Sequence, residues 1–139
     1  MKNIILCDID GTVANNDHRQ HFLEGKKDWD GFFNALDKDQ PIYPIIDKII
    51  EENKSGKEII FLTGRPERYK DLTKTWQKKY FTFDIRILMR GDNNQRNKII
   101  TKKEIFIANF KRNEIDLVID NDEELIKMWE SFGLSTLKV

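Results

Sequence analysis

The sequence predicts an α/β fold, in which five parallel strands form a sheet of order 3-2-1-4-5 with helices on both faces. Short apolar runs alternate with segments of helical periodicity, which is typical of a doubly wound parallel sheet. Acidic or hydroxyl residues directly follow three of these runs, as expected where parallel strands end at one edge of a sheet. Right-handed crossovers over both faces allow this strand order with short connections.

The predicted elements follow one another from the N-terminus. The first strand, Ile4–Cys7, is a short apolar run that ends at an acid. Two of the helices have a recognisable apolar face, made by Ile99, Ile100, Ile105 and Phe106 in one and by Leu125, Ile126 and Trp129 in the other. The predicted strands are Ile4–Cys7 and residues 58–62, 85–89, 117–119 and 135–139, and the predicted helices are residues 44–54, 67–79, 98–110 and 123–132.

Residues 14–43 interrupt this alternation. They are polar and aromatic, and we interpret them as an elaborated loop with one short helix near residues 30–36. Because the segment follows the first strand, it is expected to form a small cap that arches over the carboxyl edge of the sheet. Trp29, Phe32 and Phe33 can stack a nucleobase, although packing is the expected role of most of these rings.

Length and composition limit the function classes. At 139 residues the chain is expected to be one domain, residues 1–139. Lys plus Arg equals Asp plus Glu, 24 each, so net charge predicts neither strong non-specific nucleic-acid binding nor attraction to a membrane. No apolar run approaches the ~20 residues of a membrane span. The one cysteine, Cys7, excludes an internal disulfide and fits a reducing compartment, and no leader-like segment is visible, so a cytoplasmic location is expected.

The first strand leads into the most informative motif, Asp8-Ile9-Asp10-Gly11-Thr12. Two acids separated by one residue at a strand end can share Mg²⁺, which takes oxygen ligands. An ionised aspartate beside that cation can also attack phosphorus and form an aspartyl-phosphate. The alternative is an ordinary turn after a strand, since Asp and Gly are common turn residues.

Two further strand ends carry candidate residues. Thr63, Gly64 and Arg65 follow the second strand, where a hydroxyl, a close backbone and a planar guanidinium can hold a phosphoryl group. The alternative is a helix start with Thr63 as its cap. Asp120 follows the fourth strand and is a candidate metal ligand. Capping of the next helix is the alternative, and Asp122 can take that role instead.

A lysine is needed to neutralise the phosphate and the acids around it. Lys98, Lys102 and Lys103 lie in one helical stretch and are the candidates, although each alone is more typical of a solvated surface lysine.

The DxDGT motif resembles the first motif of the haloacid dehalogenase (HAD) superfamily, which consists mostly of phosphatases. The resemblance implies a three-layer, Rossmann-like sandwich with Asp8 as nucleophile and Asp10 as general acid and base. It also implies a Mg²⁺ ion held by Asp8, Asp10 and Asp120 with the backbone carbonyl of Ile9, while Asn121 accepts a hydrogen bond from a metal-bound water.

A narrower resemblance covers nearly the whole chain. The strings at 8–14, 63–66, 102–106, 117–121 and 128–134 are similar to the phosphatase domain of phage polynucleotide kinase/phosphatase. That resemblance implies Lys102 as the third-motif lysine and Arg19 and Arg65 as phosphate or substrate contacts. Two positions depart from it, because Lys98 and Asn121 stand where the family often has acids. These 139 residues contain no G-x-x-x-x-G-K-[ST] phosphate loop, so no kinase active site is expected within them.

These residues predict a Mg²⁺-dependent phosphomonoesterase that works through an aspartyl-phosphate and removes 3′-phosphates from nucleic-acid ends. A phosphatase of nucleoside monophosphates or of other small phosphomonoesters is the first alternative. A non-catalytic phosphate-binding module is a second, but neither the nucleophile nor the lysine is missing. A response-regulator-like receiver is the least favoured, because its phosphorylated Asp follows a later strand.

Overall fold

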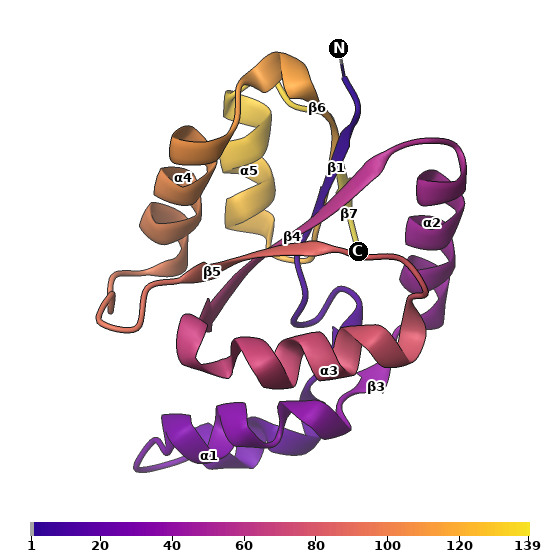
Figure 1. Cartoon of the computed structure of the whole chain (residues 1–139). Helices are drawn as coiled ribbons and strands as arrows, with labels where there is room; N and C mark the ends of the chain where they lie inside the picture. The colour runs from indigo at the N-terminus through magenta and orange to yellow at the C-terminus, as the bar shows by residue number, and fades with distance from the viewer. Residues whose placement is uncertain (1) are drawn as a thin grey trace.

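The computed structural model describes residues 2–139 and contains the predicted five-stranded parallel sheet (Figure 1). Its order is β5-β4-β1-β6-β7, which is 3-2-1-4-5 when these five strands are numbered along the chain. The predicted topology is therefore confirmed. The strands are β1 (Ile4–Cys7), β4 (Glu58–Pro66), β5 (Arg86–Arg90), β6 (Ile115–Asp120) and β7 (Thr136–Lys138).

Two apolar clusters lie on opposite faces of the sheet, because successive side chains of a strand point to opposite sides. Ile5 and Cys7 of β1 belong to the cluster that includes residues of α2 (Tyr43–Lys54) and α3 (Lys70–Tyr80). Ile4 and Leu6 belong to the cluster that includes residues of α4 (Lys98–Asn109) and α5 (Glu123–Ser131). The central strand is thus buried on both faces, which explains its uninterrupted apolar sequence.

The second strand is longer than predicted. It continues from Leu62 to Pro66, with an irregular register against β5 between these two residues. The Thr63-Gly64-Arg65 stretch therefore lies within the end of the strand, and the following helix begins with a 3₁₀ turn, η3 (Glu67–Tyr69). This extension was not predicted, because Thr63-Gly64-Arg65 is a polar stretch with a glycine, which is typical of turns.

The segment after β1 forms a small cap, as predicted for residues 14–43. Two two-residue strands, β2 (Ala14–Asn15) and β3 (Gln40–Pro41), pair antiparallel and close its base. Between them lie η1 (Asp17–Leu23), α1 (Trp29–Asn34) and η2 (Leu36–Lys38), so the predicted short helix is present but starts one residue earlier and ends in a 3₁₀ turn. Figure 1 shows α1 running alongside α3.

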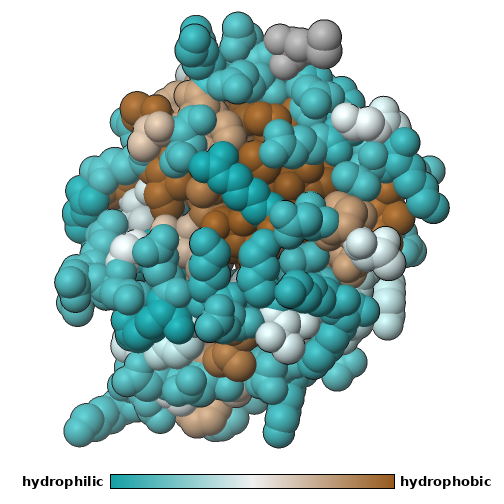
Figure 2. Space-filling model, in the orientation of Figure 1, coloured by the Kyte–Doolittle hydropathy of each residue, from teal (hydrophilic) through white to brown (hydrophobic). Residues whose placement is uncertain are grey.

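The surface is largely hydrophilic on the face that Figure 2 shows, except for apolar side chains gathered across its middle, where β4 and β5 lie in Figure 1. Among the helices described for residues 2–139, none has both the length and the apolar character needed to cross a bilayer.

Candidate active site

The loop after β1 places Asp8 at the carboxyl edge of the sheet. Its backbone N–H donates to the carbonyl of Ile119 at 2.9 Å, so β1 remains aligned with β6 up to this residue. Its carboxylate is buried and accepts from Lys102 Nζ at 2.8 Å and from Thr12 Oγ1 at 3.1 Å. Burial raises the pKa of Asp8 to about 6, against the lowering effect of Lys102.

A tight turn follows Asp8. The carbonyl of Ile9 accepts the backbone N–H groups of Thr12, Val13 and Ala14 at 3.0–3.1 Å. The turn already uses the lone pairs of this carbonyl, which opposes the Mg²⁺ ligation that the resemblance implies for it. Among residues 2–139, no donor reaches the carbonyl of Asp10, so that oxygen, unlike the Ile9 oxygen, is free to accept or to bind a cation.

The carboxylate of Asp10 is held by two arginines. Arg19 Nη2 donates to Oδ1 at 2.6 Å, and Arg65 donates to Oδ1 at 2.8 Å through Nη2 and to Oδ2 at 3.1 Å through Nε. Burial alone would raise the pKa of Asp10, but the charges of Arg65 and Arg19 outweigh it and lower the pKa to about 2. Asp8 and Asp10 are two residues apart and have opposite electrostatic environments.

Helix α4 brings Lys102 to the same edge. Its ammonium lies 2.8 Å from Asp8 Oδ1 and 3.4 Å from Asp120 Oδ2, in a buried position. Burial would lower the pKa of Lys102, but the two carboxylates raise it above its usual value, so the group stays charged. The other candidate lysines lie elsewhere: Lys98 pairs with Asp122, and Lys103 lies over the ring of Phe132.

At the end of β6, Asp120 and Asp122 have different hydrogen-bond partners, which decides which of them caps the next helix. Asp120 Oδ1 accepts the N–H groups of Asn121 and Asp122, while Oδ2 faces Lys102. Asp122 caps α5 by accepting from the N–H of Leu125 at 3.1 Å. Asp120 is consequently free of the capping role and joins Asp8 at the site.

Within residues 2–139, no three acidic, His or Cys side chains converge closely enough to hold a metal ion. The expected side-chain triad of Asp8, Asp10 and Asp120 is therefore not formed in this structure, where the Asp10 carboxylate pairs with Arg19 and Arg65. Asp8 and Asp120 remain as a carboxylate pair with a single ammonium between them. Such a pair with one carbonyl fits Mg²⁺, which commonly uses one or two carboxylates and retains several waters.

The end of β4 contributes the second group of predicted residues. Thr63 is buried, and its Oγ1 accepts from the N–H of Arg65 at 3.2 Å. Gly64 lies beneath Arg90, whose Nε donates to the glycine carbonyl at 2.9 Å. A Cβ on Gly64 would stay 3.6 Å from Arg90 Nη2, so the protein itself leaves this position open.

Asp39, which no sequence motif indicated, completes the arginine network. Its buried carboxylate accepts from Arg19 Nε and Nη2, both at 2.8 Å, and from Arg65 Nη2 at 3.3 Å. His18 Nε2 lies 2.7 Å from the same carboxylate. Asp39 stands in a polar stretch without strand or helix periodicity. The sequence carries no direct signal for it, and only the burial of Arg19 and Arg65 in the structure shows that they require an acidic partner.

Comparison with known proteins shows the family to which this chain belongs. The family model for the polynucleotide kinase PNKP phosphatase domain matches residues 2–139. The chain belongs to this family. It is a HAD-type phosphatase domain, and both resemblances noted in the sequence are confirmed.

Individual relatives agree with the family. A protein of Autographa californica nuclear polyhedrosis virus, described as a bifunctional polynucleotide kinase/RNA ligase, is 25% identical over 137 residues, which are 96% of this chain and 18% of the relative. The solved Pnkp1/Rnl/Hen1 complex contains a chain with 26% identity and a TM-score of 0.78, covering 99% of this chain and 46% of that chain.

A hydrolase of the haloacid dehalogenase-like family from Streptococcus pneumoniae shares the fold at 16% identity, with a TM-score of 0.65 over 99% of this chain and 84% of that chain. The chain spans less than half of the PNKP-type chain and about a fifth of the viral relative.

Proposed function

We propose that this phosphatase hydrolyses phosphomonoesters through a covalent aspartyl-phosphate on Asp8, with a 3′-phosphate at a nucleic-acid end as its substrate. The observation that carries the proposal is the position of Lys102, which holds the carboxylates of Asp8 and Asp120 together at the sheet edge while two arginines hold Asp10 beside them. The proposed nucleophile Asp8, the neutralising charge of Lys102 and the proposed proton carrier Asp10 are then adjacent.

Asp8 would attack phosphorus with one carboxylate oxygen. The P–O bond to the leaving group breaks as the Asp8 O–P bond forms, and the leaving oxygen takes a proton from Asp10. In the second step water loses a proton to Asp10, attacks the phosphoryl group and releases phosphate and the free Asp8 carboxylate. With a pKa of about 6, Asp8 is mostly ionised at neutral pH, as a nucleophile must be.

The residues that would hold Mg²⁺ are the carboxylates of Asp8 and Asp120 with the carbonyl of Asp10. When bound, the cation would neutralise charge on the phosphoryl oxygens. Lys102 would add a fixed positive charge on the same side, and Thr63 would donate its hydroxyl to a phosphoryl oxygen.

Asp10 needs a proton before it can act as an acid, and its low pKa in the free enzyme opposes this. An incoming phosphate dianion competes for Arg19 and Arg65, which now contact Asp10. If either guanidinium exchanged its contact with Asp10 for one with the substrate phosphate, the pKa of Asp10 would rise. Substrate binding would in this way allow Asp10 to take up the proton that it later donates.

The preferred substrate is a nucleic-acid 3′-end, because the family is the phosphatase domain of polynucleotide kinase PNKP and the viral relative is described as a polynucleotide kinase/RNA ligase. A nucleoside monophosphate or another small phosphomonoester is the alternative. It is favoured by the zero net charge, which provides little general attraction for a polyanion.

We further propose that residues 1–139 act as one catalytic domain in a reducing compartment such as the cytoplasm. The central strand β1 contributes to both apolar clusters, which ties the two faces of the fold together. The only cysteine, Cys7, is free and buried in that strand.

One assay tests the proposal. Phosphate release is measured with and without Mg²⁺ from a 3′-phosphorylated oligonucleotide, a matched 5′-phosphorylated oligonucleotide, and 3′- and 5′-mononucleotides. We expect Mg²⁺-dependent release that is fastest from the 3′-phosphorylated oligonucleotide. Faster release from 5′-mononucleotides would assign the enzyme to the alternative, and no release from any of the four would refute both.

A further inference from the structure

The cap carries three aromatic rings in series that the proposed mechanism does not use. The ring of Trp29 is stacked on Phe33 with centroids 6.0 Å apart and planes at 23°. Phe33 is in turn stacked on Tyr69, at 5.1 Å and 29°. We call Trp29, Phe33 and Tyr69 the aromatic column. It joins α1 of the cap to η3, which follows β4.

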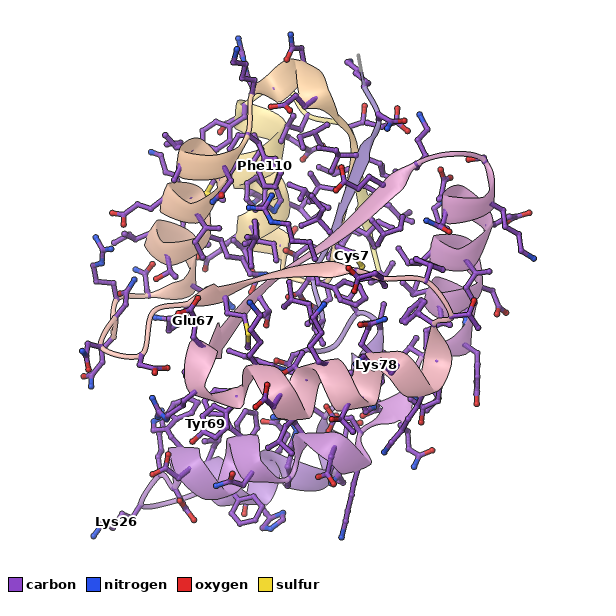
Figure 3. The ribbon with its side chains drawn as sticks, viewed as in Figure 1. Cys7, Lys26, Glu67, Tyr69, Lys78 and Phe110 are labelled. Carbon is purple, nitrogen blue, oxygen red and sulfur yellow. The ribbon has the colours of Figure 1, made fainter. Side chains whose placement is uncertain are left out.

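The aromatic column is connected to the catalytic edge. Arg19, which contacts Asp10, has its guanidinium 4.3 Å above the ring of Phe32. The edge of Phe32 meets both Trp29, at 5.9 Å, and Phe33, at 5.1 Å. Tyr69 is four residues after Arg65, and Figure 3 shows it at the beginning of α3, between that helix and α1.

The inner end of the aromatic column is fixed, and its outer end is open. Tyr69 is buried and donates its hydroxyl to Asp30 at 2.5 Å, with Arg68 4.9 Å over its ring. Trp29 at the outer end is 48% exposed. The other two tryptophans, Trp76 and Trp129, are each 1% exposed, so a large ring at the surface is unusual for this chain.

The charge beside Trp29 is suited to a nucleotide. Lys27 Nζ lies 5.6 Å from the centroid of the indole ring. An exposed cation–π contact is worth only about 0.5–1 kcal/mol, so a flat aromatic ligand can replace it. The displaced ammonium would remain close enough to pair with a backbone phosphate of that ligand. A ring for the base and a cation for the phosphate are the two elements of single-strand binding sites.

We propose that Trp29 stacks an unpaired nucleobase of the strand whose 3′-phosphate enters the active site. The inference rests on the proposed function and adds a position for the nucleotide. An unpaired base has both faces open and can rotate onto the indole ring, whereas the terminal base of a blunt duplex is paired and already stacked on one side. The aromatic column therefore favours single-stranded or frayed ends over blunt duplex ends.

Binding is tested by tryptophan fluorescence in the Asp8→Asn protein, which should not turn over the ligand. Because the other two tryptophans are buried, a single-stranded 3′-phosphorylated oligonucleotide should quench Trp29 selectively. Deoxy- and ribo-oligonucleotides are both titrated, to show which sugar the site prefers. Matched oligonucleotides with abasic 3′-terminal positions should not quench. Equal quenching by normal and abasic strands would overturn the proposal.

Kinetics provide the second test, with Trp29→Ala, Trp29→Phe and the control Tyr43→Ala, which removes an exposed aromatic ring from the start of α2. Stacking energies predict that Trp29→Ala raises KM for the 3′-phosphorylated oligonucleotide by about 5- to 150-fold. The loss should be larger than on p-nitrophenyl phosphate, Trp29→Phe should restore most of it, and Tyr43→Ala should behave as wild type.

The two proposals fail in different ways. A wild-type enzyme that hydrolyses mononucleotides but not oligonucleotides refutes the 3′-end substrate. A wild-type enzyme that is active on oligonucleotides, with an unchanged KM in a folded Trp29→Ala protein, refutes the stacking site alone. Circular dichroism establishes that the variant is folded.

Discussion

At the level of single residues, the site gives two chemically identical side chains, Asp8 and Asp10, opposite shifts in pKa. Asp8 is buried beside one lysine and another carboxylate, so its pKa is raised to about 6. Asp10 contacts two arginines, so its pKa is lowered to about 2 despite burial. Carboxylates whose environments push their pKa values apart commonly have different roles in one reaction. This difference supports nucleophile and proton carrier as separate assignments.

The nucleophile assignment gives the first prediction. Asp8→Asn should abolish turnover while retaining the fold, because the amide is nearly isosteric but cannot attack phosphorus. Asp10→Asn should reduce kcat by roughly 10²–10⁴-fold, the usual contribution of a proton-transfer group. Steady-state kinetics and near-UV circular dichroism measure both effects. Wild-type activity in Asp8→Asn would falsify the mechanism.

The second prediction concerns pH and the ion pairs of Asp10. The folded pKa of about 2 lies below the usual value of 3.8, so the stabilisation is complete above pH ~4 and is lost as pH falls toward 2. The difference in unfolding free energy between wild type and Asp10→Asn should therefore shrink by about 2 kcal/mol between pH 5 and pH 2. Urea denaturation across this range measures it, and a constant difference would contradict the ion-pair account.

The third prediction concerns Asp39, which touches both arginines but no candidate reacting atom. Asp39→Asn should lower kcat/KM by roughly 10²-fold, because Arg19 and Arg65 lose the charge that orients them. Breaking a buried charge pair should also cost about 3 kcal/mol of stability. Enzyme kinetics and urea denaturation measure the two losses. Asp37→Asn, two residues away and outside the network, is the control and should retain both activity and stability.

At the level of elements, prediction succeeded where burial imposes a pattern. The continuous apolar run of Ile4–Cys7 and the helix over residues 98–110 were recognisable, because the core requires apolar residues at those positions. It failed where contacts between distant residues decide the structure. The pairing of β2 with β3 involves two residues on each side, too few to leave a periodic signal. The arginine network of Asp39 likewise exists only after the cap folds back.

The turn between β1 and β2 supports a fourth prediction. Gly11 has φ +78°, and a Cβ there would lie 2.2 Å from Asn121 Nδ2. Gly11→Ala should cost about 1–2 kcal/mol of stability for the left-handed backbone and should also displace the Asn121 amide. Because this turn positions both aspartates, activity should fall too, as measured by phosphate release.

Gly133→Ala is the matched control for this turn. Gly133 has a similar φ of +81°, but the nearest atom to its added Cβ is Arg112 Nη1 at 3.7 Å, away from the site. The control should lose comparable stability, measured by urea denaturation, and keep its activity. Equal activity losses in the two variants would mean that the loss comes from general destabilisation and not from the site.

At the level of the whole molecule, the sheet topology assembles the site from residues far apart in sequence. β1 lies between β4 and β6, so the ends of the three strands bring Asp8, Thr63 and Asp120 to one edge. This convergence was predictable, because parallel strands connected by crossovers end on the same side. Which main-chain carbonyl remains free was not predictable, since it depends on the turn that binds the Ile9 oxygen.

The last prediction follows from the charge assembled at that edge. Two carboxylates, Asp8 and Asp120, share one ammonium and leave a net negative charge in a buried place. Mg²⁺ should therefore raise Tm as it is titrated, since a ligand that binds only the folded state stabilises it. Asp120→Asn should remove most of this shift, whereas Asp122→Asn, which alters only the helix cap and its lysine pair, should retain it. In the activity assay, chelator should silence the wild-type enzyme and Mg²⁺ should restore it. Ca²⁺ should still raise Tm but support little turnover, because its longer bonds and looser geometry misplace the reacting groups. A Tm that does not respond to Mg²⁺, together with full activity in chelator, would show that Lys102 alone balances the two carboxylates.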